Sequence, residues 1–386
     1  MKLFYLKNLI IKKGFYFILA LTFSLAGSSI YYYFQAKQVK EEQIALSSRL
    51  TSLTSDFEKI KNEDQVKRNE ILSDEIKNIQ STYQKSSNIY EKLLDYQGKD
   101  IKVKTLYANA IFDLSKKNYA SASAKLVEIE KILSSEQIKI AAEFKIPANV
   151  PENNTAPSSG YAKQSVKTDI GTFLVDIISA DLGSTRVIVD SASDSDCSND
   201  CPVLSLSDYV SRNGAFAGVN GSYFCPADYP SCADKKNSYD TLIMNKNKKY
   251  INSDNNVYSK VPAVIFLEGS VRFVGQSLEW GRDTSVNGVL ANYPLLLSGG
   301  NIAFGGGSDP KQGSKGSRSF VGTKGSTIYI GVVHNATVAE VAHVLKALGI
   351  DYALNLDSGG STALWSGSYK VGPGRNIPSA ILFVHK

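Results

Sequence analysis

A capped helix followed by a strand and a glycine-rich turn, residues 337–362, constrains the fold of this chain most strongly. Thr337 and Glu340 have the spacing of a capping box, and an apolar helical face follows them (Val338, Val341, Ala342, Leu345 and Leu348). Gly349 suits the end of that helix. The next apolar run carries a carboxylate to its carboxyl end, directly before small residues (Asp357, then Ser358, Gly359, Gly360, Ser361 and Thr362). Glycines let backbone N–H groups approach a ligand and hydroxyls add donors, so this unit predicts a polar ligand site on a rigid edge.

The amino-terminal region predicts a membrane helix. Residues 15–34 carry no charge, and a run of about 20 residues is enough to span a bilayer core. Lysines precede this run, and the first acidic residue is Glu41. We therefore expect a cytoplasmic tail at residues 1–14 and an extracytoplasmic location for everything after the span, in a single-pass membrane protein. A cleaved signal peptide is the alternative, because Ser24–Ala26 and Ala26–Ser28 are passable cleavage sites, but the length of the apolar run favours an uncleaved anchor.

The cysteines predict two disulfide bonds in the exported part. All four cysteines fall within a short segment (Cys197, Cys201, Cys225 and Cys232). An even, clustered set in an oxidising compartment is typical of disulfides. Sequential pairing is the simplest of the three connectivities. A zinc site is the less favoured alternative, because none of the three histidines lies near the cluster.

A helical stalk is predicted between the anchor and the exported domain. Apolar residues step by three and four through residues 36–97, with an interruption around residues 62–70 and Gly98 at the end. The spacing fits a coiled coil that forms a homodimer, and it equally fits two helices that pack within one chain. Residues 101–135 predict a helical hairpin, for which a plain spacer is favoured over a single tetratricopeptide-like repeat. Residues 147–165, rich in proline and small polar residues, predict a linker.

The remainder, residues 166–386, predicts an α+β domain. Short β-rich runs dominate it, and helices are marked only at 338–348 and, more weakly, near 206–212. This pattern favours a substantial mixed sheet with few helices.

Two further segments are candidates for ligand binding. Asn220, Gly221, Ser222 and Tyr223 offer an amide and hydroxyls for a sugar, but the pattern alone favours a tight β-hairpin at this Asn-Gly between apolar residues. Glycine-rich residues 299–307 precede Lys311, Lys315 and Arg318, a composition that suits a phosphate and equally suits a generic surface loop.

Several function classes are disfavoured. The net charge of +6 owes much to the amino-terminal tail, so no basic stripe for nucleic acid remains. The alternating carboxylates from Asp190 to Asp200 lack the glycine and final glutamate of an EF-hand, and no cofactor or metal is indicated. The motifs of common serine hydrolases and zinc metalloproteases are absent from the sequence. His334, at a predicted strand end, is a candidate acid–base group or an incidental histidine.

Four motifs in order resemble the phosphodiester glycosidase family. They are Asn220–Phe224, Arg318–Gly322, the helix and strand leading to Asp357–Ser361, and Arg375–Pro378. The resemblance covers about residues 165–386. It implies an α+β catalytic domain that cleaves the sugar C1–O bond of a glycosyl phosphodiester, such as one carrying N-acetylglucosamine. Bacterial relatives are linked to exopolysaccharide or cell-envelope metabolism.

The resemblance also implies roles for individual residues. Asp357 and Arg318 would be catalytic, with the carboxylate at the reacting centre and the guanidinium facing the phosphate. Asn220, Tyr223 and Asn376 would bind the sugar together with the neighbouring loop residues. Three features depart from the family pattern: Ser358 stands where a glycine is usual, His334–Ala336 replaces a glycine-containing turn, and an insertion follows Phe224.

These observations predict a membrane-anchored extracytoplasmic glycosidase that acts on sugar phosphodiesters of the envelope. A non-catalytic glycan-binding module displayed on the stalk is the alternative, motivated by Ser358 and the missing turn glycine. A structural coiled-coil protein is a third possibility. A second catalytic carboxylate cannot be read from the sequence, and Asp240 and Glu279 are the candidates.

Overall fold

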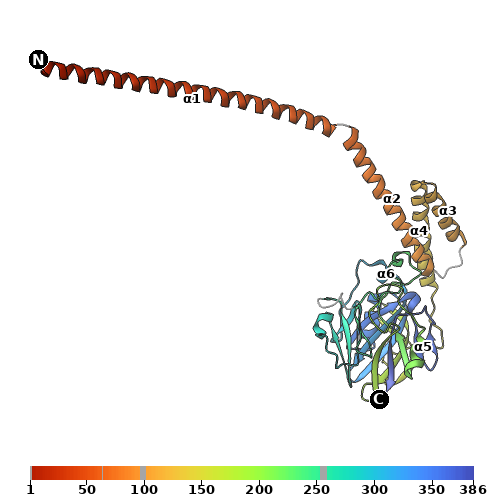
Figure 1. The fold of residues 1–386 in the computed structure, drawn as a ribbon. Helices are drawn as coiled ribbons and strands as arrows, with labels where there is room; N and C mark the ends of the chain where they lie inside the picture. The colour runs from red at the N-terminus through yellow and green to blue at the C-terminus, as the bar shows by residue number, and fades with distance from the viewer. Residues whose placement is uncertain (1, 63, 96–100, 253–258) are drawn as a thin grey trace. The chain divides into compact units, whose positions relative to one another are not determined.

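The computed structural model describes residues 2–62, 64–95, 101–252 and 259–386 (Figure 1). The chain divides into two compact units, residues 1–80 and 81–386, which we describe separately. Four helices begin the chain: α1 (Lys2–Asn62), α2 (Asp64–Asp95), α3 (Ile101–Ser115) and α4 (Tyr119–Glu143). The last residues of the predicted stalk, 96–97, and Gly98 lie outside the described residues.

The first unit contains one helix that is long and apolar enough to cross a membrane, judged by length and composition. Helix α1 ends at Asn62, where the apolar spacing of the sequence is interrupted. The stalk residues with coiled-coil spacing are exposed, for example Leu50 at 67% and Leu53 at 72%. Coiled-coil pairing of this segment therefore stays a prediction.

A small helical module opens the second unit. Its core joins the end of α2 to α3 and α4 (Ile89, Val103, Ala110, Leu126, Ile129 and Leu133). Asn118 caps α4, since its side chain accepts a hydrogen bond from the Ser121 N–H at 3.4 Å. The helix runs to Glu143 rather than residue 135, because the sequence places no proline or glycine between these positions. The predicted linker is also shorter, since strand β1 (Gly160–Thr168) begins inside it and pairs along its length with β2 (Gly171–Asp181).

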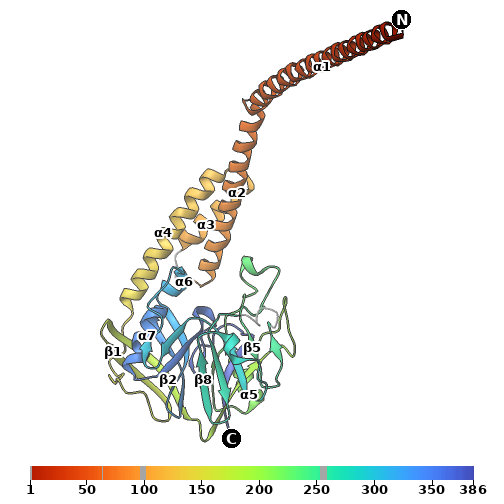
Figure 2. The same cartoon turned by 90° about the vertical axis from the view of Figure 1, so that its left-hand side faces the viewer.

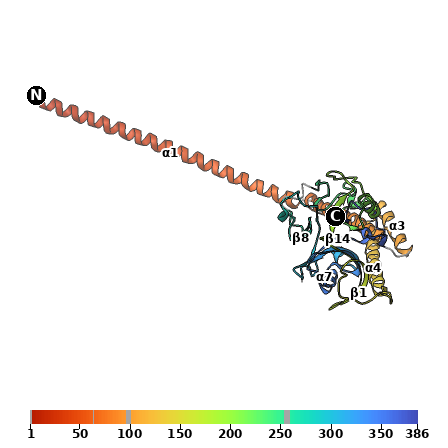
Figure 3. The same cartoon turned by 90° about the horizontal axis from the view of Figure 1, so that it is seen from below.

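The carboxyl-terminal domain is built on a seven-stranded antiparallel sheet in the order β1-β2-β13-β12-β14-β10-β11. Its remaining strands are β13 (Thr327–Ala336), β12 (Gly316–Lys324), β14 (Tyr352–Ser358), β10 (Leu295–Ser298) and β11 (Asn301–Ile302). Helix α7 (Val338–Ala347) contacts this sheet and buries its apolar face there (Figures 2 and 3). The predicted capping box is present: Thr337 Oγ1 accepts from the Glu340 N–H at 3.2 Å, and Glu340 accepts from the Thr337 N–H at 2.7 Å.

Two five-stranded antiparallel sheets complete the domain. One has the order β16-β15-β4-β17-β3, with β16 (Tyr369–Val371), β15 (Leu364–Ser366), β4 (Ala217–Asn220), β17 (Ser379–His385) and β3 (Thr185–Ser191). The other has the order β6-β5-β9-β7-β8, with β6 (Tyr250–Ile251), β5 (Ile243–Met244), β9 (Gly288–Ala291), β7 (Ala263–Leu267) and β8 (Ser270–Val274). Short helices complete the described residues: α5 (Leu206–Asn213), α6 (Pro310–Gly313), η1 (Pro230–Cys232), η3 (Ser277–Trp280) and η4 (Gly359–Ser361). A shared apolar core draws on all three sheets, and the predicted α+β class is confirmed. The prediction of a mixed sheet is wrong, because the named strands all pair antiparallel.

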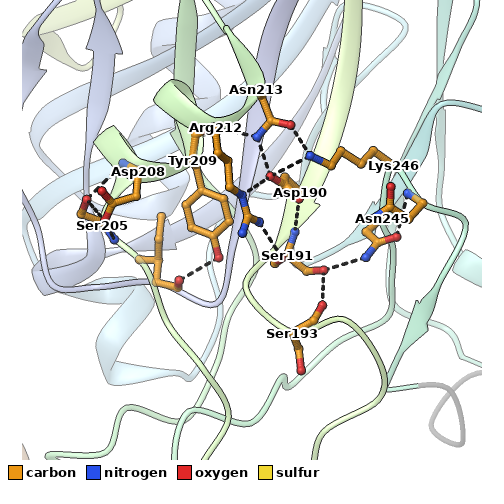
Figure 4. Close-up of polar contacts among 12 residues, drawn as sticks. Asp190, Ser191, Ser193, Ser205, Asp208, Tyr209, Arg212, Asn213, Asn245 and Lys246 are labelled. Atoms are coloured by element: carbon orange, nitrogen blue, oxygen red, sulfur yellow. Dashed lines mark hydrogen bonds and ion pairs between the residues drawn. The ribbon is translucent and has the colours of Figure 1, made fainter.

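A buried carboxylate fastens α5 to the second sheet (Figure 4). Asp190 is 2% exposed and accepts from Arg212 Nε at 2.7 Å, with Lys246 Nζ at 3.4 Å. Asn213 Nδ2 also donates to it, at 2.5 Å. The charge of Asp190 is thus paired with protein cations, and this pairing holds α5 against the sheet.

Both predicted disulfides are present with sequential pairing, Cys197–Cys201 and Cys225–Cys232. The second disulfide closes a loop that carries Tyr229 and Ser231.

Candidate functional site

The residue at the end of strand β14, Asp357, lies at the centre of the candidate site. Its backbone is clamped: its N–H donates to the Gly221 carbonyl at 3.0 Å, and its own carbonyl accepts from Asn220 Nδ2 at 2.6 Å. The carboxylate accepts from the Ser358 N–H at 2.8 Å and interacts with the Ser361 side chain. Burial raises the pKa of Asp357 to about 7, and hydrogen bonds from Ser361 and Ser358 oppose that rise only in part. The group can therefore exchange its proton near neutral pH.

The turn after Asp357 is shaped by its two glycines. Gly359 has a φ of +63°, in the left-handed region that glycine favours. At Gly360 a Cβ would lie 3.0 Å from Cζ of Arg375, so the missing side chain lets that guanidinium approach the turn. Ser358, the departure from the family pattern, turns its hydroxyl back to the Leu356 carbonyl at 3.2 Å. Thr362 Oγ1 donates to the Ser317 carbonyl at 3.2 Å and ties the turn to β12.

The segment from Asn220 to Ser222 supports the Asp357 strand from the second sheet. Strand β4 pairs with β15 and β17, so the tight hairpin that the sequence pattern favoured at this Asn-Gly is wrong. Asn220 is fully buried, and its Oδ1 accepts from Ser319 Oγ at 2.7 Å and from the Ala363 N–H at 3.1 Å. Its amide thus joins three strands, and its role as a sugar ligand stays a prediction. The Ser222 N–H likewise donates internally, to Ser379 Oγ at 3.3 Å.

Tyr223 lies beside Asp357. Burial raises the pKa of its hydroxyl, and the negative charge of Asp357 adds to that effect. The hydroxyl accepts from Asn355 Nδ2 at 2.6 Å, and the ring packs on Tyr293 with centroids 5.0 Å apart. The pair presents an aromatic wall next to the carboxylate, a surface that suits the apolar face of a sugar ring.

Arg318 is brought to the same place by the sheet register. It stands opposite Ser358 where β12 pairs with β14, and its charge interacts with Tyr223, Asp309 and Asp357. The buried guanidinium donates to the carbonyls of Lys311 at 2.7 Å and Ser314 at 2.6 Å. It therefore has two functions in the fold, holding the glycine-rich loop and placing positive charge near Asp357.

Three further charged residues belong to the candidate site, and of these the sequence had assigned no role to Arg375. Arg375 acts electrostatically on Asp357, and its guanidinium lies 5.2 Å from the ring centre of Tyr229. Lys311 Nζ lies 5.0 Å from the same ring centre. Asp240, only a guess in the sequence, is close enough to raise the pKa of Asp357. Asp240 is exposed at the residue level, but partial burial of its carboxyl group raises its own pKa.

The other predicted residues differ in their surroundings. Asn376 is exposed, and its role as a sugar ligand stays a prediction. Lys315 pairs with Glu340. Glu279 caps η3 through a 2.9 Å bond from the Gln276 N–H.

Asn292 also supports the site, although no sequence motif indicated it. Its side chain accepts from the Tyr223 N–H at 3.0 Å and donates to the Asn355 carbonyl at 2.8 Å. The one sequence feature that could have indicated Asn292 is its position directly after an apolar strand.

His334 belongs to a separate polar cluster. Its Nε2 lies 2.7 Å from a carboxylate oxygen of the fully buried Asp176, and its Nδ1 lies 3.3 Å from Ser317 Oγ. Tyr161 also donates to Asp176. This histidine is thus held by the fold and is not an isolated strand-end residue.

The arrangement brings a titratable carboxylate together with an aromatic wall and cationic side chains. Within the described ranges, no group of three or more His, Cys, Asp or Glu side chains is placed to hold a metal ion. Asp357 can stabilise positive charge at a reacting carbon, and the guanidinium and ammonium groups can bind a phosphate. Such a combination suits a charged saccharide.

Part of the chain is similar to a known protein family. Residues 213–384 match the family model described as phosphodiester glycosidase, so the resemblance predicted from the motifs is confirmed for that part of the chain. No curated protein matches the chain.

Similar solved structures include a hypothetical protein from Synechocystis, at 14% identity and a TM-score of 0.42. The match covers 58% of this chain and 62% of that protein, less than two thirds of its length. They also include the catalytic domain of zebrafish N-acetylglucosamine-1-phosphodiester alpha-N-acetylglucosaminidase, auto-inhibited by its pro-peptide, at 16% identity and a TM-score of 0.46. That match covers 61% of this chain and 86% of that domain.

Proposed function

We propose, from the phosphodiester glycosidase match of residues 213–384, that this chain is an extracytoplasmic hydrolase of sugar phosphodiesters. Its substrate would carry an N-acetylglucosamine-like sugar whose C1 is linked to a phosphodiester in an envelope polymer or exopolysaccharide. The observation that carries the proposal is the convergence of Asp357 and Arg318, from different strands, beside Tyr223.

In this reaction the bond between C1 and the phosphate oxygen breaks. The phosphate departs with the bonding electrons and carries negative charge. The side chains that face it therefore need to stabilise that charge, and a proton donor is less important. Arg318, Lys311 and Arg375 are the cations available for that task. The ionised Asp357 stabilises the positive charge that develops at C1.

A water molecule then adds to C1 and loses a proton. We assign that proton to Asp240, the solvent-accessible carboxylate that interacts with Asp357. A carboxylate whose pKa is raised is a better base than an ordinary one, which supports this assignment. The products are the free sugar and a phosphate monoester on the remaining polymer.

The long apolar helix near the amino terminus supports a membrane location for this activity. We propose that it anchors the protein with its amino terminus in the cytoplasm. The two disulfides support an oxidising environment for the carboxyl-terminal domain. The helical segments would then separate the glycosidase domain from the bilayer.

The test is the release of free sugar from a synthetic N-acetylglucosamine 1-phosphodiester by the full-length, detergent-solubilised protein. Asp357→Asn is expected to lower kcat by about 10²–10⁴-fold, the range typical for loss of a catalytic carboxylate. Asp194→Asn, at an exposed loop position, is the matched control and should leave the rate unchanged. Equal rates in the wild type and Asp357→Asn would reject the catalytic role of Asp357. Glycan binding without any turnover would favour a non-catalytic module instead.

A further inference from the structure

The end of helix α2 contacts the carboxyl-terminal domain through Glu91. Glu91 is buried, with 7% of the residue exposed, and its Oε1 accepts from the Ser231 N–H at 3.3 Å and from the Ser231 hydroxyl. Its Oε2 lies 3.6 Å from Lys311 Nζ. Figure 2 shows this end of α2 next to α6, the short helix that carries Lys311. One carboxylate of the helical module therefore holds two separate loops of the carboxyl-terminal domain.

Those two loops border the site. Ser231 lies in the loop closed by the Cys225–Cys232 disulfide, which also carries Tyr229. The Tyr229 ring is approached by both Lys311 and Arg375, and Arg375 acts electrostatically on Asp357. The Lys311 carbonyl accepts from Arg318, so the same residue is attached to the guanidinium on its other side. Contacts thus join Glu91 to Lys311, Lys311 to Tyr229 and Tyr229 to Arg375, and Arg375 acts electrostatically on Asp357.

Because Glu91 is buried, its contacts with Ser231 and Lys311 matter for stability. A carboxylate removed from water is costly unless it is paired and hydrogen-bonded, and here the Ser231 donors and the Lys311 cation provide both. By contrast, Lys311 is largely exposed, and without Glu91 its long side chain would sample many rotamers.

We propose that Glu91 is a positioning residue for the site. It holds Lys311 and the disulfide loop in the arrangement that receives the phosphate-bearing part of the substrate. The helical module is then part of the substrate site and not only a spacer. This inference rests on the proposed function for its kinetic consequence, whereas its structural consequence can be measured independently.

Two substitutions in the full-length protein separate the two contacts of Glu91. Glu91→Gln keeps an acceptor for Ser231 but removes the ion pair with Lys311. Glu91→Ala removes both. Glu128→Gln is the matched control, because Glu128 lies on α4 and pairs with Lys102 at 3.6 Å within the helical module.

Hydrogen–deuterium exchange gives the readout that needs no activity. We expect faster exchange at residues 310–315 in both Glu91 variants, and faster exchange at residues 225–232 only in Glu91→Ala. Unchanged exchange in both loops in both variants would overturn the proposal. If the wild type shows no turnover, the proposed function fails while this comparison still decides the role of Glu91.

Kinetics give the second readout. Loss of an ion-paired contact of this kind predicts a KM that rises about 3- to 10-fold in Glu91→Gln with kcat unchanged. Glu128→Gln should match the wild type. A fall in KM would mean that Glu91 competes with the substrate for Lys311, and it would overturn the positioning role.

Discussion

The charge of Asp357 acts electrostatically on Arg318, and the two residues lie on β14 and β12, which are neighbours in the seven-stranded sheet. Burial favours the neutral form of both side chains. It therefore raises the pKa of Asp357 and lowers the pKa of Arg318. Nearby charges and hydrogen bonds are therefore needed to keep each group ionised. Perturbed groups of opposite sign in one place are typical of functional sites.

The pH dependence of activity should follow the ionisation of Asp357. Its pKa of about 7 means that the carboxylate form is lost as the pH falls through neutrality. If the ionised form is required, kcat/KM should fall about tenfold for each pH unit below 7. The measurement is a pH–rate profile from pH 5 to 9, with Asp194→Asn as control. A profile that is flat across this range would contradict the role of the ionised carboxylate.

The Asp357→Asn substitution should raise the stability of the protein although it lowers its activity. The folded-state pKa of Asp357 lies above its ordinary value of 3.8, so its ionisation costs stability as the pH rises through about 7. Asparagine carries no charge and avoids this cost. The variant should therefore match the wild type near pH 4 and exceed it above pH 7, by on the order of 1–3 kcal/mol. Urea unfolding of the full-length protein at both pH values tests this, and a variant less stable at pH 8 would contradict it.

Arg318→Lys should loosen the glycine-rich loop although it keeps the positive charge. The guanidinium reaches carbonyls of Ala336, Lys311 and Ser314 together, and an ammonium group cannot reproduce that planar set of donors. We expect a loss of about 1–3 kcal/mol in the free energy of unfolding, from buried carbonyls left without donors. Proteolysis within residues 305–315 should become faster. Arg186→Lys, on strand β3, is an exposed control.

Substitution by alanine should have different effects at the two glycines of the Asp357 turn, Gly359 and Gly360. At Gly360 a new Cβ would displace the flexible guanidinium of Arg375, so kcat/KM should fall about tenfold with little change in stability. At Gly359 the space is open but φ is +63°, so alanine should cost about 1–2 kcal/mol of stability. Kinetics and urea unfolding of both variants make the comparison. The same pattern of effects in both variants would argue against a specific role for Arg375.

Local features of the sequence predicted much of the architecture. The Thr337–Glu340 capping box, the helix after it and the strand ending at Asp357 depend on residues a few positions apart, and all three are present. The sequential disulfides also follow from short spacing. The boundaries at residues 135 and 147–165 were less accurate, because strand β1 is stabilised by pairing with β2 and not by its own composition.

The order of motifs along the chain determined that Asp357, Arg318 and Tyr223 were candidates for one site, because side-chain chemistry and local backbone preference are properties of short segments. Only the tertiary structure decided which groups accompany them. Glu91, which no motif indicated, pairs with Lys311, and Arg375 and Asp240 act electrostatically on Asp357, whereas the Asn220 amide forms hydrogen bonds within the protein. Contacts between residues far apart in the chain depend on strand order and register. Those are set by burying one shared apolar core and not by any local pattern.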